Sequence, residues 1–251
     1  MSRFKKHIKT LLTVRWQPGQ DTFVALISAV LMIPVYYAGT HIKETVVNTL
    51  VFVVLGNVVL NVLFPVFYLL RVRGEGLADV GITTRKWKIA AVISLALSAV
   101  SWFGLQRIIA QTPGVDPVPQ LLVNGLILWE PFFVFGWLQL RFERAFGILP
   151  AIFLAALAMG AYHLGTFPLS GVLSMAVLGL SFAAVFRVTR NLLSMWPLTW
   201  AVCSSIGSLQ GGLVFGWSVV FIYVAVLLVQ LLGIIGIAML AHKHQQVEVQ
   251  M

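Results

Sequence analysis

Long apolar runs separated by short polar segments are the feature that most constrains this chain. A membrane-spanning helix needs roughly 20 mostly apolar residues, and eight runs approach that length. Charged residues make up only 10% of the sequence, whereas a soluble domain has about 25%. We therefore expect an all-α, polytopic membrane helix bundle that forms a single membrane domain over residues 1–251. The predicted spans are 22–39, 47–70, 89–105, 118–140, 148–164, 169–186, 192–209 and 213–241.

The basic residues predict the orientation of these spans, because cytoplasmic loops carry an excess of Lys and Arg. With eight spans, 15 of the 17 Lys and Arg residues fall in the tails and loops of one side. Only Lys43 and Arg107 fall on the other side. We therefore predict that both termini are cytoplasmic. This distribution explains the net charge of +9 without a nucleic-acid partner. No small-residue cleavage site follows the first run, so we expect a retained span rather than a signal peptide.

Two ionisable residues stand out within the apolar runs. Glu130 is the only acidic residue in these runs, and His163 is the only histidine in a comparable position. An ionisable side chain inside a membrane is costly, so a functional site is the default hypothesis. We expect the two on consecutive antiparallel helices, about 16 and 24 Å from the same end. Helix tilt or a kink at Pro131 would absorb the difference. Glu130 would accept a proton from water and His163 would bind water, substrate or metal. The alternative is a hydrogen-bonded helix contact.

A metal site is a weaker alternative. Two ligands are fewer than the three or four of a typical zinc centre, and Cys203 is the one thiol that could join Glu130 and His163. A free cysteine in an apolar run usually packs as a small hydrophobe, so the cofactor stays unknown, with a divalent metal such as zinc left open. A single cysteine also excludes an intrachain disulfide. We expect three asparagines within the runs to bond neighbouring helices, namely Asn57, Asn61 and Asn124.

Several stretches together resemble one family. Residues 130–138 read EPFFVFGWL and residues 141–147 read RFERAFG, which is similar to the EExxxR motif and following loop of the CPBP family. This family contains CAAX-processing type II proteases and bacteriocin-immunity-type (Abi) membrane proteins. Residues 159–163, MGAYH, match its FxxxH motif in part. Residues 70–82 and 190–197 are similar to the segments that flank these motifs. The resemblance covers a CPBP-like core at residues 70–207.

The resemblance implies roles for the two ionisable residues. Glu130 matches the first motif glutamate, which activates the attacking water in active members. His163 matches the second-motif histidine, which helps to hold that water or a metal. The chain departs from the family at other motif positions. The substituted positions are Pro131 for the second glutamate, Phe135 for the arginine, Met159 for the phenylalanine, Val202 for the third-motif histidine, and Ile206 and Gly207 around the expected asparagine or aspartate.

These observations predict a CAAX-protease-like intramembrane endopeptidase homologue that is catalytically impaired or inactive. Its expected partners are the lipid bilayer and a membrane-embedded or lipidated peptide, and its expected location is the plasma membrane of a prokaryote. If it is active, Glu130 is the general base. One alternative is a non-enzymatic immunity, chaperone or scaffold protein. A small proton-coupled transporter is a further alternative, which the lack of an inverted repeat disfavours.

Overall fold

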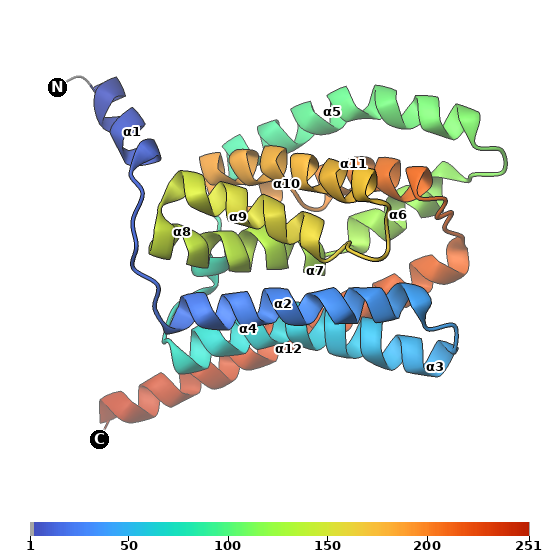
Figure 1. Ribbon diagram of the computed structural model, residues 1–251. Coiled ribbons are helices and arrows are strands. Elements are labelled where there is room, and N and C mark those ends of the chain that lie inside the picture. Colours follow the sequence, from blue (N-terminus) through green and yellow to red (C-terminus); the bar gives the residue numbers. More distant parts are fainter. Residues whose placement is uncertain (1–2, 251) are drawn as a thin grey trace. The chain divides into compact units, whose positions relative to one another are not determined.

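The apolar runs fold into helices throughout the described part of the chain. The computed structural model describes residues 3–250, and within this range it contains helices, turns and loops but no β-strand (Figure 1). This confirms the predicted all-α membrane fold. The chain forms two compact units, each made of two separate stretches of sequence. The first unit comprises Met1–Asn61 and Phe132–Val188, and the second comprises Val62–Pro131 and Thr189–Met251.

The predicted count of eight spans is not confirmed. Among the described residues, six helical stretches are long and apolar enough to cross a membrane. The other two predicted runs contain shorter helices, α9 (Ile148–Ala161) with 14 residues and α11 (Leu198–Gln210) with 13. At 1.5 Å per residue each is about 20 Å long, below the roughly 30 Å of a hydrocarbon core. The cytoplasmic placement of both termini stays a prediction. The six stretches are Gln20–His41, Thr45–Val72, Trp87–Gln111, Pro117–Phe146, Leu169–Thr189 and Trp217–His242.

The first unit is built around a buried aromatic segment. Phe132, Phe135 and Trp137 are fully buried in η4. The indole nitrogen of Trp137 donates to the Ser28 hydroxyl of α2 at 3.0 Å, which fixes a polar group within an apolar core. The elements of this unit are α1 (Arg3–Leu12), α2 (Gln20–His41), α3 (Thr45–Asn48), η1 (Thr49–Leu63), η4 (Phe132–Gln139), α8 (Leu140–Phe146), α9 and α10 (Leu169–Thr189), with η1 and α10 each ending just inside the second unit.

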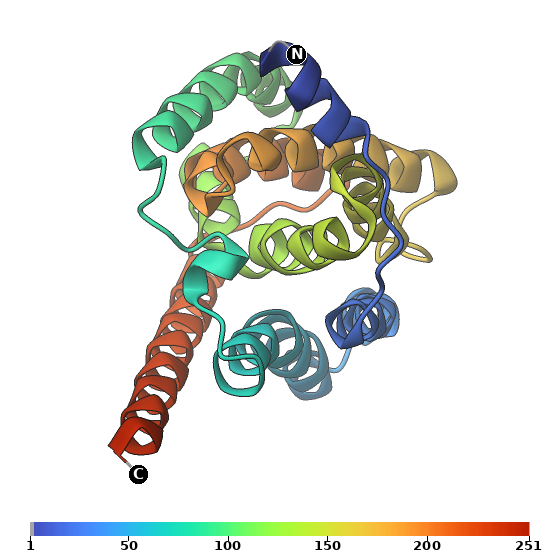
Figure 2. The same ribbon diagram turned by 90° about the vertical axis from the view of Figure 1, so that its left-hand side faces the viewer.

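An extended segment after α1 packs on the turn between α8 and α9. Figure 2 shows this segment in dark blue, between α1 and α2. The Arg15 backbone N–H donates to the Phe146 carbonyl and that of Gln17 to the Ala145 carbonyl, each at 2.9 Å. These bonds satisfy carbonyl groups at the end of α8, which lack partners within the helix. Gly147 makes the close approach possible, because its φ is +93° and a Cβ there would overlap the Thr13 carbonyl oxygen.

We expect Gly147→Ala to destabilise the protein by about 1–3 kcal/mol, since it combines a strained backbone with this overlap. The measurement is the unfolding midpoint in detergent, followed by circular dichroism. Gly74→Ala is the matched control, because Gly74 also has a positive φ, +65°, but has open space around its Cβ position. An equal loss in both variants would show that backbone strain alone is responsible and would contradict a role for the overlap.

The second unit packs α5 (Trp87–Gln111), α6 (Pro117–Leu126) and α11 together. Leu105 of α5 forms a buried cluster with Val202 and Leu209 of α11. The close fit includes Gly125 of α6, whose added Cβ would lie 3.3 Å from Ala201. The remaining elements of this unit are α4 (Phe64–Phe67), η2 (Tyr68–Val72), η3 (Leu77–Val80), α7 (Trp129–Pro131), η5 (Leu192–Ser194) and α12 (Trp217–Gln250).

The polar connection before α5 is well structured. Gly81 ends η3 with a φ of +80°, and its carbonyl accepts from the Leu192 N–H at 3.0 Å. The Asn191 side-chain amide donates to the carbonyls of Thr83 and Arg85, both at 2.8 Å. Asn191 therefore connects the segment before α11 with the segment before α5 by two hydrogen bonds.

Candidate functional site

Glu130 follows a break in the fourth predicted span. The run 118–140 does not form one helix, because α6 ends at Leu126 and Ile127 adopts an extended conformation with a ψ of 95°. A new helical stretch begins at Trp129, so the carboxylate lies in the first turn of a helical segment rather than in its middle. Negative charge is favoured at that end by the helix dipole. Glu130 is half-buried, and its sequence neighbours Trp129 and Pro131 are buried.

The surroundings of Glu130 include a phenol. Tyr223, on α12 of the same unit, interacts electrostatically with the Glu130 carboxylate. Sequence reasoning missed Tyr223 because a tyrosine within an apolar run is an ordinary membrane residue.

His163 lies in the turn that follows α9, and it is 4% exposed. Its Nδ1 atom is 2.7 Å from the Met159 carbonyl oxygen. A carbonyl oxygen only accepts, so this bond requires the proton on Nδ1 and leaves Nε2 as the acceptor of the neutral imidazole. A lone pair on Nε2 is what proton transfer, water binding or metal binding requires. Any residue at position 159 supplies this carbonyl oxygen, so the backbone fixes the imidazole tautomer without the phenylalanine of the FxxxH motif.

Aromatic rings surround the His163 imidazole within the first unit. The centroid distances are 4.3 Å to Tyr162, 4.8 Å to Tyr36 and 5.2 Å to Phe167. These rings hold the imidazole plane and limit the access of water. Tyr36 comes from α2, far from His163 in sequence, so no local sequence pattern indicates this contact. Tyr162 is the sequence neighbour of His163, so it is the one ring of the three whose proximity the sequence itself indicates.

Glu130 and His163 belong to different units. Glu130 is in the second and His163 in the first, and the structure describes each within its own unit. The pairing of these side chains in one site therefore stays a prediction.

Three positions at which the family motifs carry polar residues are apolar and buried here. Pro131 is buried in α7. Phe135 is fully buried, with its ring centroid 6.2 Å from Phe182 in an edge-to-face contact at 89° and 6.3 Å from Phe186. Val202 is 4% exposed and belongs to the cluster with Leu105 and Leu209. These side chains stabilise the fold by packing and carry no group that donates a hydrogen bond.

Cys203 contacts a hydroxyl group. Its thiol donates to the Ser101 hydroxyl of α5 at 3.3 Å. Within either unit, the described residues include no group of three or more His, Cys, Asp or Glu side chains that could hold a metal ion. Glu130 and His163 are two ligands, and a typical zinc centre needs three or four. These residues therefore do not fit a zinc centre.

Two of the asparagines act as predicted, by bonding neighbouring helices. Asn124 of α6 donates to Ser205 of α11 at 3.1 Å and accepts from Ser204 at 2.8 Å. The Asn61 amide nitrogen of η1 lies 3.1 Å from the Met32 sulfur of α2. Asn57 is fully buried on the same helix as Asn61. Asn124 and Asn61 thus have structural partners that account for their presence in apolar helices.

A comparison with known families agrees with the resemblance that the motifs indicate. Residues 115–202 match the family described as type II CAAX prenyl endopeptidase Rce1-like. The matched segment contains both Glu130 and His163 and ends at Val202. This confirms the resemblance that the motifs indicated. No curated protein and no solved structure matches the chain.

Proposed function

We propose that this CAAX-protease-like membrane protein is an endopeptidase homologue with impaired or absent catalysis, which binds a membrane peptide or a lipidated tail. The observation that carries the proposal is the burial of apolar side chains at three motif positions, Pro131, Phe135 and Val202. Such side chains cannot orient water or stabilise a developing oxyanion.

The two retained residues suit a reduced version of the reaction. Peptide hydrolysis needs a base that activates water and hydrogen-bond donors that stabilise the oxyanion. We assign Glu130 the role of base and His163 that of orienting the water through Nε2. Loss of one oxyanion donor costs about 10²–10³ in rate. Because several polar motif positions are replaced here, we expect turnover to be very slow or absent.

The same pair also suits binding without turnover. A carboxylate and an imidazole acceptor can each accept hydrogen bonds from peptide N–H groups, and such bonds are worth more where water is scarce. The membrane spans supply the apolar surroundings that a lipidated or membrane-embedded peptide requires. Binding therefore needs only the groups that the chain retains, whereas hydrolysis needs groups that it lacks.

The test is a panel of membrane peptides and prenylated peptides offered to the protein reconstituted in vesicles. We expect measurable binding of at least one peptide with little or no cleavage. Glu130→Gln and His163→Ala should each weaken binding, and any residual cleavage should disappear in both. His242→Ala is the matched control, since His242 is an exposed histidine of α12.

The outcomes separate the alternatives. Rapid cleavage by the wild type that Glu130→Gln abolishes would overturn the proposed impairment. Peptide binding that is insensitive to Glu130→Gln and His163→Ala would favour a non-enzymatic scaffold. Proton-coupled uptake into vesicles would favour a transporter.

A further inference from the structure

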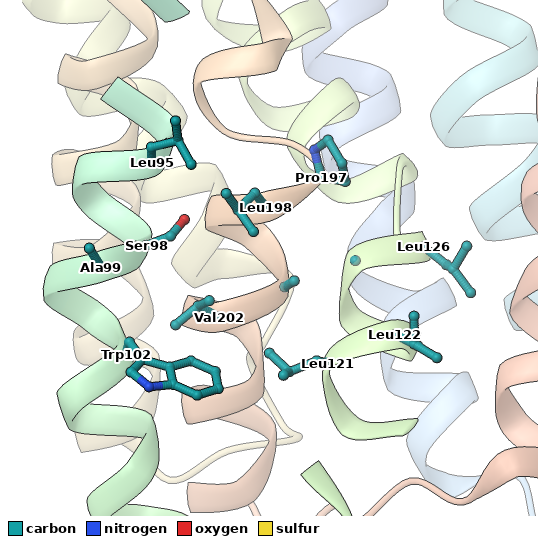
Figure 3. Close-up of a pocket in the computed structure, with 12 residues that line it drawn as sticks. Leu95, Ser98, Ala99, Trp102, Leu121, Leu122, Leu126, Pro197, Leu198 and Val202 are labelled. Carbon is teal, nitrogen blue, oxygen red and sulfur yellow. The ribbon is translucent and has the colours of Figure 1, made fainter. Parts of the chain in front are cut away.

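An apolar pocket of about 590 Å³ lies among α5, α6 and α11 of the second unit. Figure 3 shows side chains from all three helices around it, including Trp102 from α5, Leu121 from α6, and Leu198 and Val202 from α11. The volume lies within the roughly 300–1,000 Å³ that is usual for small-molecule sites. The pocket is therefore large enough to hold a ligand rather than being a packing defect.

The position of the pocket along α5 indicates the solvent around it. The α5 lining residues fall between Leu95 and Trp102, 8 to 15 residues beyond the start of the helix at Trp87. This corresponds to about 12–22 Å along a helix of about 37 Å. α5 is a candidate span, so its middle lies within the hydrocarbon core of the bilayer. Lipid chains, rather than water, are available at this depth.

The lining favours a ligand without polar groups. The lining residues that the structure describes include no charged side chain. Their one hydroxyl, on Ser98, donates to the Ser94 carbonyl at 2.7 Å. Trp102 adds one indole N–H, so a peptide or a headgroup placed here would lose hydrogen bonds to water that this lining mostly does not replace, whereas a hydrocarbon chain would lose none.

The pocket is continuous with an exposed apolar face of α5. Leu95 lines the pocket and is 60% exposed, and Val92 and Phe103 on the same helix are exposed as well. On a membrane-spanning helix these exposed side chains contact lipid. A chain from the surrounding bilayer therefore reaches the pocket without crossing a polar region.

We propose that this pocket holds one acyl chain of a membrane phospholipid. The bound acyl chain contacts α5, α6 and α11 together, because it supplies dispersion contacts that the empty apolar pocket lacks. Val202 is part of the wall, so a position that matches a motif histidine serves lipid packing here. Neither Glu130 nor His163 lines the pocket, so lipid binding here requires neither side chain.

The test is native mass spectrometry of the protein released from lipid nanodiscs of defined phosphatidylglycerol and phosphatidylethanolamine content. We expect one retained phospholipid on the wild type. Leu198→Trp, which places an indole in the pocket, should lower occupancy at least about tenfold, the equivalent of 1.4 kcal/mol. Val100→Trp is the matched control, since Val100 is 74% exposed on α5 and does not line the pocket; it should retain the lipid.

A second variant controls for misfolding. Ala99→Phe fills the pocket from α5 instead of α11, and the unfolding midpoint followed by circular dichroism reports whether the variant remains folded. Loss of lipid with an unfolding midpoint close to that of the wild type supports the proposal. Equal lipid retention in wild type, Leu198→Trp and Ala99→Phe would overturn it. Release of the lipid by a stoichiometric farnesylated peptide would also overturn it, because the pocket would then be a substrate site. Glu130→Gln should leave lipid retention unchanged.

Discussion

Replacing Phe135 with arginine, the residue of the family motif, is expected to prevent stable folding. Phe135 is fully buried against Phe182 and Phe186. Removing a buried phenylalanine costs about 3–5 kcal/mol, and a guanidinium without a counter-ion in the same space adds a further desolvation cost. We expect a total of about 5 kcal/mol or more, which is comparable to the whole stability of many proteins.

The measurement is the yield and unfolding midpoint of purified Phe135→Arg beside Phe135→Leu. The leucine variant removes the ring but adds no charge, so it should fold with a moderate loss. If Phe135→Arg instead folds as well as Phe135→Leu, the guanidinium must find a polar partner. The position would then still be compatible with the catalytic motif, and the proposed loss of catalysis would lose its main support.

Apolar run length predicted the membrane fold, whereas two of the eight predicted spans contain helices of only 14 and 13 residues. α9 and α11 are shorter than the runs that contain them. α9 ends at Ala161, three residues before the end of its run, and α11 begins only after Pro197, which lies within the run 192–209. Proline is visible in the sequence, but within an apolar run it is also compatible with a kinked, continuous helix.

The break before Glu130 was predicted only as a kink. Gly125 and Pro131 flank the extended residues Ile127 and Leu128, but a proline within an apolar run is compatible with a kinked helix as well as with a break. The preceding helix, α6, is held to α11 by the Asn124 hydrogen bonds. Tertiary contacts of this kind override local helical preference. A single sequence therefore identified Glu130 as unusual but could not place it at a helix start.

Arg141 shows a different limit of sequence reasoning. The distribution of basic residues assigned it to a cytoplasmic loop, yet it lies on α8 and is 1% exposed. Its guanidinium is 5.6 Å from the centre of the Trp137 ring, and its Nη1 is 3.9 Å from an Asp21 carboxylate oxygen of α2. Asp21 is 120 residues away in the sequence, so no local pattern indicates this pair. Charge counting predicts which side a loop faces, but not whether a charge is buried.

We expect Arg141→Ala to destabilise the protein by about 3 kcal/mol, the lower end of the cost of removing one partner of a buried ion pair, because the Asp21 side chain is 16% exposed. The variant also loses the contact of the guanidinium with Trp137 and the packing of the arginine methylene groups. Arg141→Lys should recover part of the loss, because it restores the charge but not the planar guanidinium. The measurement is the unfolding midpoint in detergent, with yield as a second readout.

Arg144→Ala is the matched control for this prediction. Arg144 lies on the same helix, three residues further on, and is exposed, so its removal should change stability by less than about 0.5 kcal/mol. A similar small change in Arg141→Ala would contradict the prediction and show that Arg141 is readily replaced despite its burial. A large loss confined to Arg141 would instead show that the RFERAFG segment stabilises the first unit through a buried charge. Its similarity to the family loop would then reflect folding as well as function.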